Sequence, residues 1–140
     1  MFLLDTNVIS ELRKAKPHGA VLAWFHSIAI RDTSIPAVVI GEIQEGAEIT
    51  RRQNPAKALE IEAWLEKVMA TFSVVPMDGN MFREWARLTT GKSDDLSGDA
   101  MVAATARVRH LTVVTRNVKD FKSFDVNVLN PFVTATREQR

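Results

Sequence analysis

The chain has 140 residues, of which 46% are hydrophobic and 25% are charged, a balance typical of a globular domain with a hydrophobic core. Its 18 Lys and Arg against 17 Asp and Glu give a net charge of +1, so overall charge favours neither a nucleic-acid nor a membrane partner. The absence of cysteine excludes disulfides and zinc–thiolate sites, and no apolar run approaches the length of a membrane span. We therefore expect a single cytoplasmic domain at 1–133 and a polar tail at 134–140.

Short apolar runs alternate with longer helical patterns along the chain. The periodicity predicts helices at about residues 6–14, 20–28, 36–50, 55–70, 79–88 and 98–109. Apolar and β-branched runs predict strands at about residues 1–4, 32–35, 72–75, 111–115 and 126–129. The expected helix caps include Asn7 or Thr6, Ser34, Asp78 and Ser97. This alternation predicts an α/β fold with three layers, α/β/α, around a central, mostly parallel five-stranded sheet.

The first predicted strand stops abruptly at a polar segment. Apolar residues 1–4 are followed directly by Asp5, Thr6 and Asn7. Ligands of open parallel sheets bind at the carboxyl ends of the strands, so Asp5 is a candidate site residue. The alternative is that Asp5 only caps the helix that follows.

Three more acids could reach the same edge of the sheet. Glu42 borders the apolar stripe of its helix, where a carboxylate is unfavourable unless it binds a cation or a buried arginine. Asp99 lies in the first turn of an alanine-rich helix, where the helix dipole stabilises the ionised acid by ~0.3–1 kcal/mol, so helix capping is its alternative explanation. Asp120 follows the strand at 111–115, and its alternative role is that of a turn residue.

If the four acids converge, they require a counter-charge, because neighbouring carboxylates cannot all stay ionised without one. No histidine lies near them in the sequence, so the ligands would all be oxygen atoms. Such a set suits Mg²⁺ or Mn²⁺ rather than zinc. A hard divalent cation at such a site supports phosphodiester hydrolysis, because it activates water and neutralises the charge that develops on the phosphate.

Several segments in a fixed order resemble the PIN-domain family, and in particular the VapC toxins with their FitB-like branch. The segments are Met1-Phe2-Leu3-Leu4-Asp5-Thr6-Asn7-Val8-Ile9-Ser10-Glu11, the Glu42 helix, Asp99-Ala100-Met101-Val102-Ala103-Ala104-Thr105-Ala106, Thr115-Arg116-Asn117-Val118-Lys119-Asp120-Phe121 and Val128-Leu129-Asn130-Pro131-Phe132. Each motif alone is loose, but their order and spacing together are specific. The resemblance covers the chain nearly from end to end.

The resemblance implies a PIN-like nuclease domain that acts as a Mg²⁺- or Mn²⁺-dependent endoribonuclease toxin. It also implies a homodimer or a hetero-oligomer with a cognate VapB-like antitoxin, which would bring the toxin to DNA only indirectly. By matching, Asp5, Glu42 and Asp99 are the core acids and metal ligands.

The fourth acidic position is either Asn117 or Asp120. Many relatives have an aspartate where this chain has Asn117, and we expect Asp120 to take the role. The remaining positions would orient the substrate or ligand, and they are Thr6, Asn7, Thr115, Arg116 and Asn117.

Basic clusters could hold the phosphates of an RNA substrate. They are Arg13 with Lys14 and Lys16, Arg51 with Arg52, and Arg116 with Lys119. Taken singly, each cluster fits a solvated surface better than a phosphate site, and this alternative is strongest for Arg51 and Arg52. The helical spacing of Trp24, Trp64 and Trp85 favours core packing over base stacking. The resemblance further implies an apolar groove for the antitoxin between the first helices and the Glu42 helix.

Two other functions fit parts of the sequence. The first is a receiver-like phospho-acceptor domain with Asp78 as acceptor, but Asp78 fits a helix cap better and no lysine closes the fifth strand. The second is a non-catalytic RNA-binding PIN module, which the uncharged Asn117 leaves open.

Overall fold

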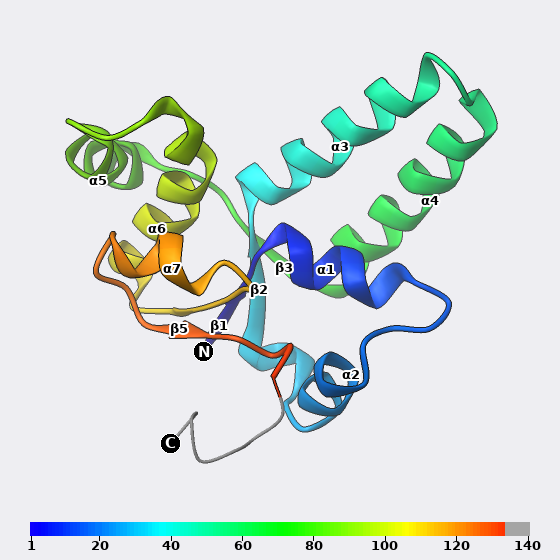
Figure 1. Cartoon of the computed structure of the whole chain (residues 1–140), viewed down its shortest axis with the longest axis horizontal. Helices are drawn as coiled ribbons and strands as arrows, with labels where there is room; N and C mark the ends of the chain where they lie inside the picture. The colour runs from blue at the N-terminus through cyan, green and yellow to red at the C-terminus, as the bar shows by residue number, and fades with distance from the viewer. Residues whose placement is uncertain (134–140) are drawn as a thin grey trace.

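The computed structural model describes residues 1–133, which contain a five-stranded sheet in the order β3-β2-β1-β4-β5 (Figure 1). All four neighbouring pairs are parallel. The strands are β1 (Phe2–Leu4), β2 (Thr33–Pro36), β3 (Ser73–Val75), β4 (Thr112–Val114) and β5 (Val128–Leu129). The predicted α/β/α fold with a five-stranded sheet is confirmed.

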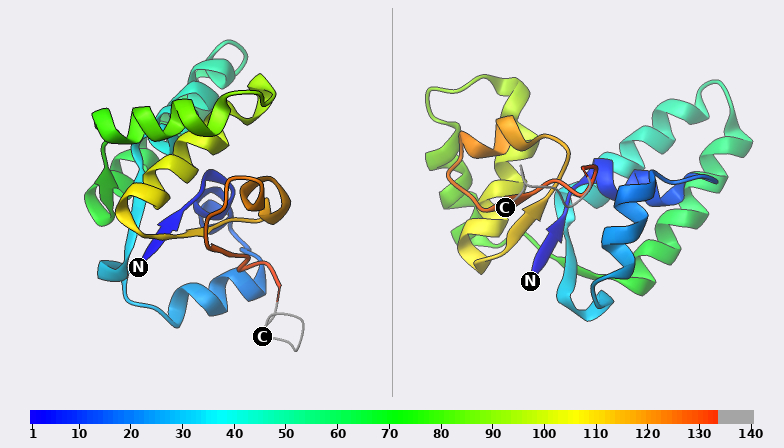
Figure 2. Two further views of the ribbon diagram at one scale, coloured as in Figure 1. Left: turned by 90° about the vertical axis from the view of Figure 1, so that its left-hand side faces the viewer. Right: turned by 60° about the horizontal axis from the view of Figure 1, so that its bottom comes forward.

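Helices cover both faces of the sheet. They are α1 (Thr6–Arg13), α2 (Gly19–His26), α3 (Ala37–Arg51), α4 (Pro55–Thr71), α5 (Gly79–Thr89), α6 (Ser97–Arg109) and α7 (Val118–Lys122). Helices α1 to α4 lie on one side of the sheet and α5 to α7 on the other (Figures 1 and 2). None of the helices within residues 1–133 is long and apolar enough to cross a membrane. The expected tail at 134–140 lies outside the described residues.

The central strand β1 is apolar along its length because both of its faces are covered. It pairs with β2 on one side and with β4 on the other, in a register that places Leu3 opposite Ser34 and Val113. Leu3 and Val113 are completely buried. A parallel strand between two helix layers has no solvent face, so its sequence does not alternate.

Helix α6 packs closely in the domain interior because its buried face consists mainly of small residues. Ala100, Ala103, Ala104 and Ala106 are all buried. The helix ends at His110, whose positive φ of 56° places it in the left-handed conformation that often terminates helices. Asp99 therefore stands at the start of a helix that is fixed between the sheet and α5.

Three predicted helix caps are wrong. Ser34 does not cap α3 because its backbone continues the sheet, where it pairs with β1 and β3. Ser97 is already the first residue of α6, because a 3₁₀ turn at Asp94–Leu96 leads directly into that helix. Asp5, rather than Thr6 or Asn7, caps α1, and its side chain accepts a hydrogen bond from the Thr6 amide.

The helix at Val118–Lys122 was not predicted, and it places Asp120 within a helix rather than in a turn. Five residues are too few for a helical periodicity to emerge from the sequence. The predicted cap Asp78 is confirmed, since its Oδ1 accepts a hydrogen bond of 2.9 Å from the Met81 amide.

The buried core of the sheet gives a stability prediction. Leu3→Ala should lower the free energy of unfolding by about 2–5 kcal/mol, because a cavity forms where the side chain is fully enclosed. Leu59→Ala is the matched control, since Leu59 is 62% exposed and its loss should cost less than about 0.5 kcal/mol. Urea unfolding of both variants measures the difference. Equal losses would show that β1 is not the centre of the core.

Candidate active site

Asp5 is held rigidly at the carboxyl end of the central strand. Its side chain is only 4% exposed. The backbone amide of Asp5 donates to the Val114 carbonyl at 3.0 Å, which extends the pairing of β1 with β4 by one residue. One carboxylate oxygen accepts from the Thr6 amide at 2.8 Å, and the other accepts from the Thr115 hydroxyl at 2.8 Å and the Asn7 amide group at 3.3 Å. Asp5 is thus both a helix cap and a buried carboxylate.

Thr115 joins the ends of β1 and β4. Its hydroxyl donates to Asp5 and accepts from the Asn7 side chain and from the Asn117 amide, each at 3.0 Å. The hydroxyl therefore uses its donor and both acceptor positions. Asn7 closes the network, because its Oδ1 accepts a 3.0 Å hydrogen bond from the Arg116 amide. These contacts fix the direction in which the Asp5 carboxylate points.

Glu42 reaches the same region from α3. Its Oε2 accepts a hydrogen bond of 3.0 Å from the Thr6 hydroxyl, so the residue after Asp5 orients the second acid. Its Oε1 lies beside Gly98 at the start of α6, where an added Cβ would be only 3.3 Å away. Gly98 therefore lets the carboxylate approach α6. No local pattern in the sequence indicates this role of Gly98, because the contact joins residues far apart in the chain.

Asp99 completes the group of acids from the first turn of α6. Burial raises its pKa from 3.8 to about 6, and the negative charges of Asp5, Asp120 and Glu42 contribute to this rise in pKa. Acids from α3, α6, α7 and the turn between β1 and α1 are thus close enough to affect one another electrostatically. Asp120 itself is exposed on α7.

The pKa values of Asp5 and Glu42 are raised as well. Burial raises the pKa of Asp5, although the hydrogen bonds from Thr115 and Thr6 oppose this effect. Burial likewise raises the pKa of Glu42, with smaller contributions from the charges of Asp5 and Glu45 and with an opposing hydrogen bond from Thr6. Such shifts in a hollow between two layers are typical of functional sites.

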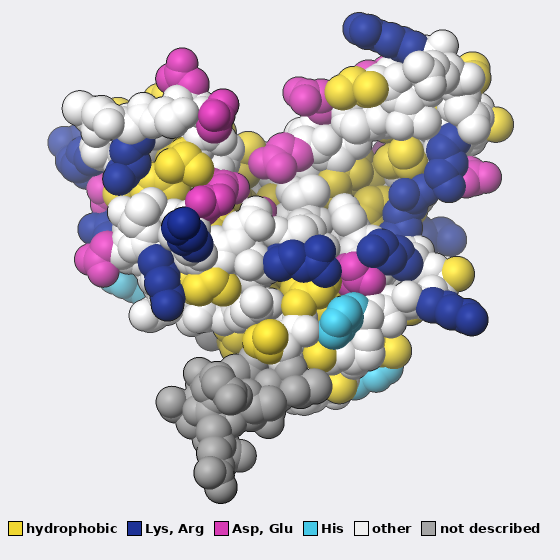
Figure 3. All heavy atoms as spheres, viewed as in Figure 1, with side chains coloured by type: hydrophobic (Ala, Val, Ile, Leu, Met, Phe, Trp, Pro, Cys, Tyr) yellow, Lys and Arg dark blue, Asp and Glu magenta, His cyan; other side chains and the backbone are white. Residues whose placement is uncertain are grey.

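The alternative role of Glu42, as the partner of a buried arginine, finds no such arginine in the described part of the chain. No Lys, Arg or His within residues 1–133 forms an ion pair with Asp5, Glu42 or Asp99. Figure 3 shows acidic side chains on both sides of the hollow between the two groups of helices. This excess of negative charge calls for a cation from outside the chain.

The donor set fits a hard divalent cation, although the described residues hold no group of three acids or histidines already arranged as metal ligands. All candidate donors are oxygen atoms, as Mg²⁺ and Mn²⁺ prefer. Asp5 is fixed and buried, whereas Asp99 is half-buried and Glu42 is exposed, so both have space to adjust. The metal-binding and catalytic roles of these acids stay predictions.

The basic clusters differ in how free their charges are. Arg51 pairs with Glu48 and Glu62 on the hairpin of α3 and α4, which agrees with its expected role as surface. Lys14 pairs at 2.9 Å with Glu11, a buried acid that the sequence analysis did not single out.

Trp24, Trp64 and Trp85 are partly buried and pack against the core, as predicted.

The receiver-like alternative receives no support from the position of Asp78. This residue follows the edge strand β3, two strands away from β1, and its carboxylate is used to cap α5. Asp5 and Asp78 therefore do not share one end of neighbouring strands.

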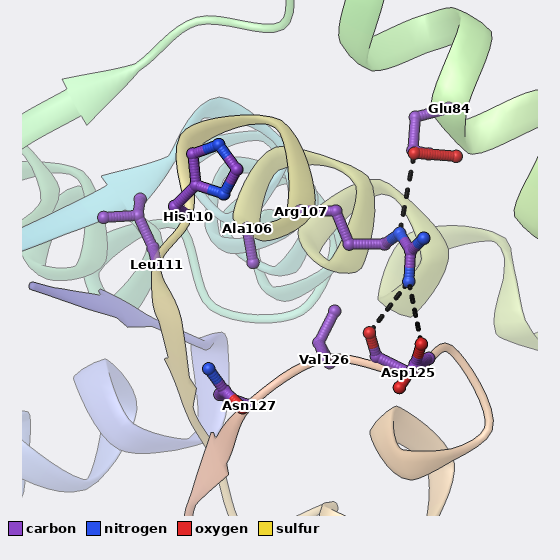
Figure 4. A pocket seen from close by; sticks show the side chains of 8 residues that line it. All are labelled: Glu84, Ala106, Arg107, His110, Leu111, Asp125, Val126 and Asn127. Atoms are coloured by element: carbon purple, nitrogen blue, oxygen red, sulfur yellow. Dashed lines mark hydrogen bonds and ion pairs between the residues drawn. The ribbon is translucent and has the colours of Figure 1, made fainter.

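A separate cavity of about 350 Å³ lies between α5, α6 and the segment before β5 (Figure 4). Its charged groups satisfy one another. The Arg107 guanidinium donates to the carbonyls of Phe124 and Asp125 at 3.1 and 2.8 Å, and it lies 3.5 Å from the Glu84 carboxylate. The hydrogen bonds of Arg107 thus hold the segment after α7 against α6.

The family follows from comparison with known proteins. The sequence profile described as PIN domain matches residues 2–127. The chain belongs to the PIN domain family. Toxin FitB of Neisseria gonorrhoeae is 32% identical to this PIN-domain chain over 94% of this chain and 99% of that protein. A VapC ribonuclease of Sinorhizobium fredii is 32% identical over 96% of this chain and 100% of that protein.

Solved structures agree with this assignment. FitAcB from Neisseria gonorrhoeae matches with a TM-score of 0.82 and 33% identity, over 94% of this chain and 99% of that one. FitAB bound to a DNA fragment matches with a TM-score of 0.83 and 30% identity, over 98% and 99% of the two chains. The resemblance to the FitB-like branch of VapC proteins is confirmed.

The raised pKa of Asp99 predicts a pH-dependent effect in metal-free protein. Folded Asp99 binds its proton more tightly than the unfolded chain does, so its ionisation lowers stability as pH rises from about 4 through about 6. Asp99→Asn should therefore stabilise the protein near pH 7 but hardly near pH 4. Urea unfolding with a chelator present measures this at both pH values.

The control is Asp94→Asn, since Asp94 is exposed on the preceding 3₁₀ turn. It should show no such difference between the two pH values. If Asp99→Asn raised the free energy of unfolding equally at both pH values, the raised pKa of Asp99 would be refuted.

Proposed function

We propose that this PIN-domain protein is a Mg²⁺- or Mn²⁺-dependent endoribonuclease and the toxin of a toxin–antitoxin pair. The observation that carries the proposal is the set of three carboxylates, Asp5, Glu42 and Asp99, whose pKa values are all raised and which have no cationic partner within residues 1–133. The names of the relatives, Toxin FitB and VapC ribonuclease, support the same function.

Asp5, Glu42 and Asp99 would hold the divalent metal. When bound, it supplies Lewis-acid chemistry, which activates water and neutralises charge on the phosphate. Thr115 and Asn7 keep the Asp5 carboxylate directed into the hollow, and Thr6 does the same for Glu42. Such supporting contacts matter because ligands held in place need no reordering when the metal and the RNA arrive.

Asp120 is our choice for the fourth acid. Its charge acts on Asp99, and α7 holds it beyond the end of β4. Asn117 is exposed, and its backbone amide donates to Thr115. In this proposal Asn117 shapes the turn that carries Arg116 and Asp120, while Asp120 supplies the negative charge.

The partners also follow from the relatives. FitB has been solved as FitAB bound to a DNA fragment. By analogy, a VapB-like antitoxin would bind this toxin, hold it inactive and bring it to DNA indirectly. We place the toxin in the cytoplasm, as a homodimer or within a hetero-oligomer with the antitoxin.

The direct test is RNA cleavage by the purified protein with Mn²⁺ or with a chelator. Asp5→Asn and Asp99→Asn should each lower the cleavage rate by more than about 100-fold, because loss of a supporting contact alone typically costs 10–100-fold. Asp94→Asn is the matched control and should cleave normally. Circular dichroism should show that each variant is folded. The proposal would be refuted if both site variants cleaved RNA at the wild-type rate, or if the chelator did not lower the rate of the wild type.

The same assay assigns the fourth acid. Asp120→Asn should lower the rate by about 10-fold or more, whereas Asn117→Ala should have a smaller effect. The reverse order would assign the position to Asn117. RNA binding without any metal-stimulated cleavage by the wild type would instead favour a non-catalytic RNA-binding module.

A further inference from the structure

Arg116 combines a free charge with a fixed position. Its guanidinium carbon lies 3.8 Å from the centre of the Phe132 ring. No carboxylate within residues 1–133 forms an ion pair with it, although the side chain is exposed. The stacking contact thus orders this arginine without an ion pair, although its charge helps to lower the pKa of Glu11.

The support under Arg116 is itself fixed. Phe132 contacts His18 edge-to-face, with ring centres 5.6 Å apart. The Phe132 amide donates to the Asn130 side chain at 2.9 Å. On the other side, the backbone amide of Arg116 donates to Asn7. Both the backbone and the side chain of Arg116 are therefore held before any ligand arrives.

Arg13 also lies over an aromatic ring, that of Trp64, but at 5.7 Å from its centre, and two further cations are paired with acids. Lys14 is paired with buried Glu11, and Arg107 with Glu84 and Asp125. Arg116 directly follows Thr115, whose hydroxyl donates to Asp5. Figure 3 shows basic side chains in a row below the acidic hollow, over α7, the segment before it and the end of α1.

We propose that Arg116 binds an RNA phosphate next to the one that is cleaved, and that Phe132 is the positioning residue that holds its guanidinium for this contact. One face of the guanidinium lies on the ring, but its N–H edge stays free, and this edge matches two phosphate oxygens. A cation at the rim also offsets the repulsion between the acidic hollow and a polyanion. This inference rests on the proposed function, because it names how that site takes its substrate.

The test separates RNA binding from cleavage. Binding of a short fluorescein-labelled single-stranded RNA is measured without metal by fluorescence anisotropy, and KM and kcat are measured with Mn²⁺. Arg116→Ala should raise both Kd and KM by about 5–10-fold, as expected for a lost charge-assisted contact, and leave kcat within about 2-fold. The slope of log Kd against log salt should fall by about 0.7, the value for one phosphate contact on a single strand.

The charge-matched control is Arg109→Ala. Arg109 is exposed in the last turn of α6, ten residues after Asp99 and so about 15 Å along the helix axis. This variant should keep the affinity and the KM of the wild type. Equal affinities for Arg116→Ala and Arg109→Ala would overturn the proposal for Arg116.

Phe132→Leu tests the positioning role, because it keeps an apolar side chain and the Arg116 charge but removes the aromatic face. We expect a rise of about 2–5-fold in Kd with an unchanged salt slope, since the phosphate contact persists but is less well ordered. An unchanged Kd would refute the role of Phe132. Arg116→Lys should keep the salt slope of the wild type, because the charge is retained. Its affinity should lie between those of the wild type and Arg116→Ala, because lysine lacks the planar edge that can donate two hydrogen bonds.

The outcomes also distinguish this inference from the proposed function. A wild type that cleaves RNA, with Arg116→Ala binding as tightly as the wild type, refutes the Arg116 contact alone. A wild type that shows no metal-stimulated cleavage refutes the nuclease function, and in that case the dependence of RNA affinity on Arg116 is still read from the anisotropy measurement.

Discussion

The hydrogen bond from the Thr115 hydroxyl to the buried Asp5 carboxylate is the contact on which the site depends. It joins the ends of the two central strands, β1 and β4, and it fixes an acid that burial would otherwise make unfavourable. The position of Asp5 then determines the others. Thr6 follows it and directs Glu42, and Asn7 follows Thr6 and holds the Arg116 amide.

Asp5, Glu42 and Asp99 lower the stability of the fold when no cation is bound. Helix α6 brings Asp99 to Asp5, and Gly98 lets Glu42 approach the same helix end. Each of these three acids has a raised pKa, mainly because burial disfavours its charge, so without a cation the folded state carries a cost that the unfolded chain does not. Repulsion from neighbouring acids adds to this cost at Glu42 and Asp99. Proteins retain such costs at functional sites, and binding of a cation would offset this one.

The sequence predicted the parts of the site that follow from local pattern. An apolar run that stops at Asp5 indicates a buried strand with an acid at its end, and the alanine-rich segment after Asp99 indicates a packed helix. Glu42 could be proposed because it borders an apolar stripe. That Asp5, Glu42 and Asp99 converge is a matter of tertiary structure, and only the resemblance to the PIN family suggested it beforehand.

The sequence failed where contacts between distant residues decide the outcome. Ser34 has the chemistry of a helix cap, but pairing with β1 and β3 keeps it in the sheet. The closeness of Gly98 to Glu42, and the stacking of Arg116 on Phe132, join residues that no local pattern connects.

The central claim is that these carboxylates form one pocket that takes a hard divalent cation. Thermal unfolding with increasing Mn²⁺ tests it most directly, without reference to any substrate. The claim predicts that Mn²⁺ stabilises the wild type by about 2.7 kcal/mol at a hundred times its Kd, and that Asp5→Asn loses most of this stabilisation. A wild type whose unfolding temperature ignores Mn²⁺, or an Asp5→Asn variant that is stabilised equally, would contradict it.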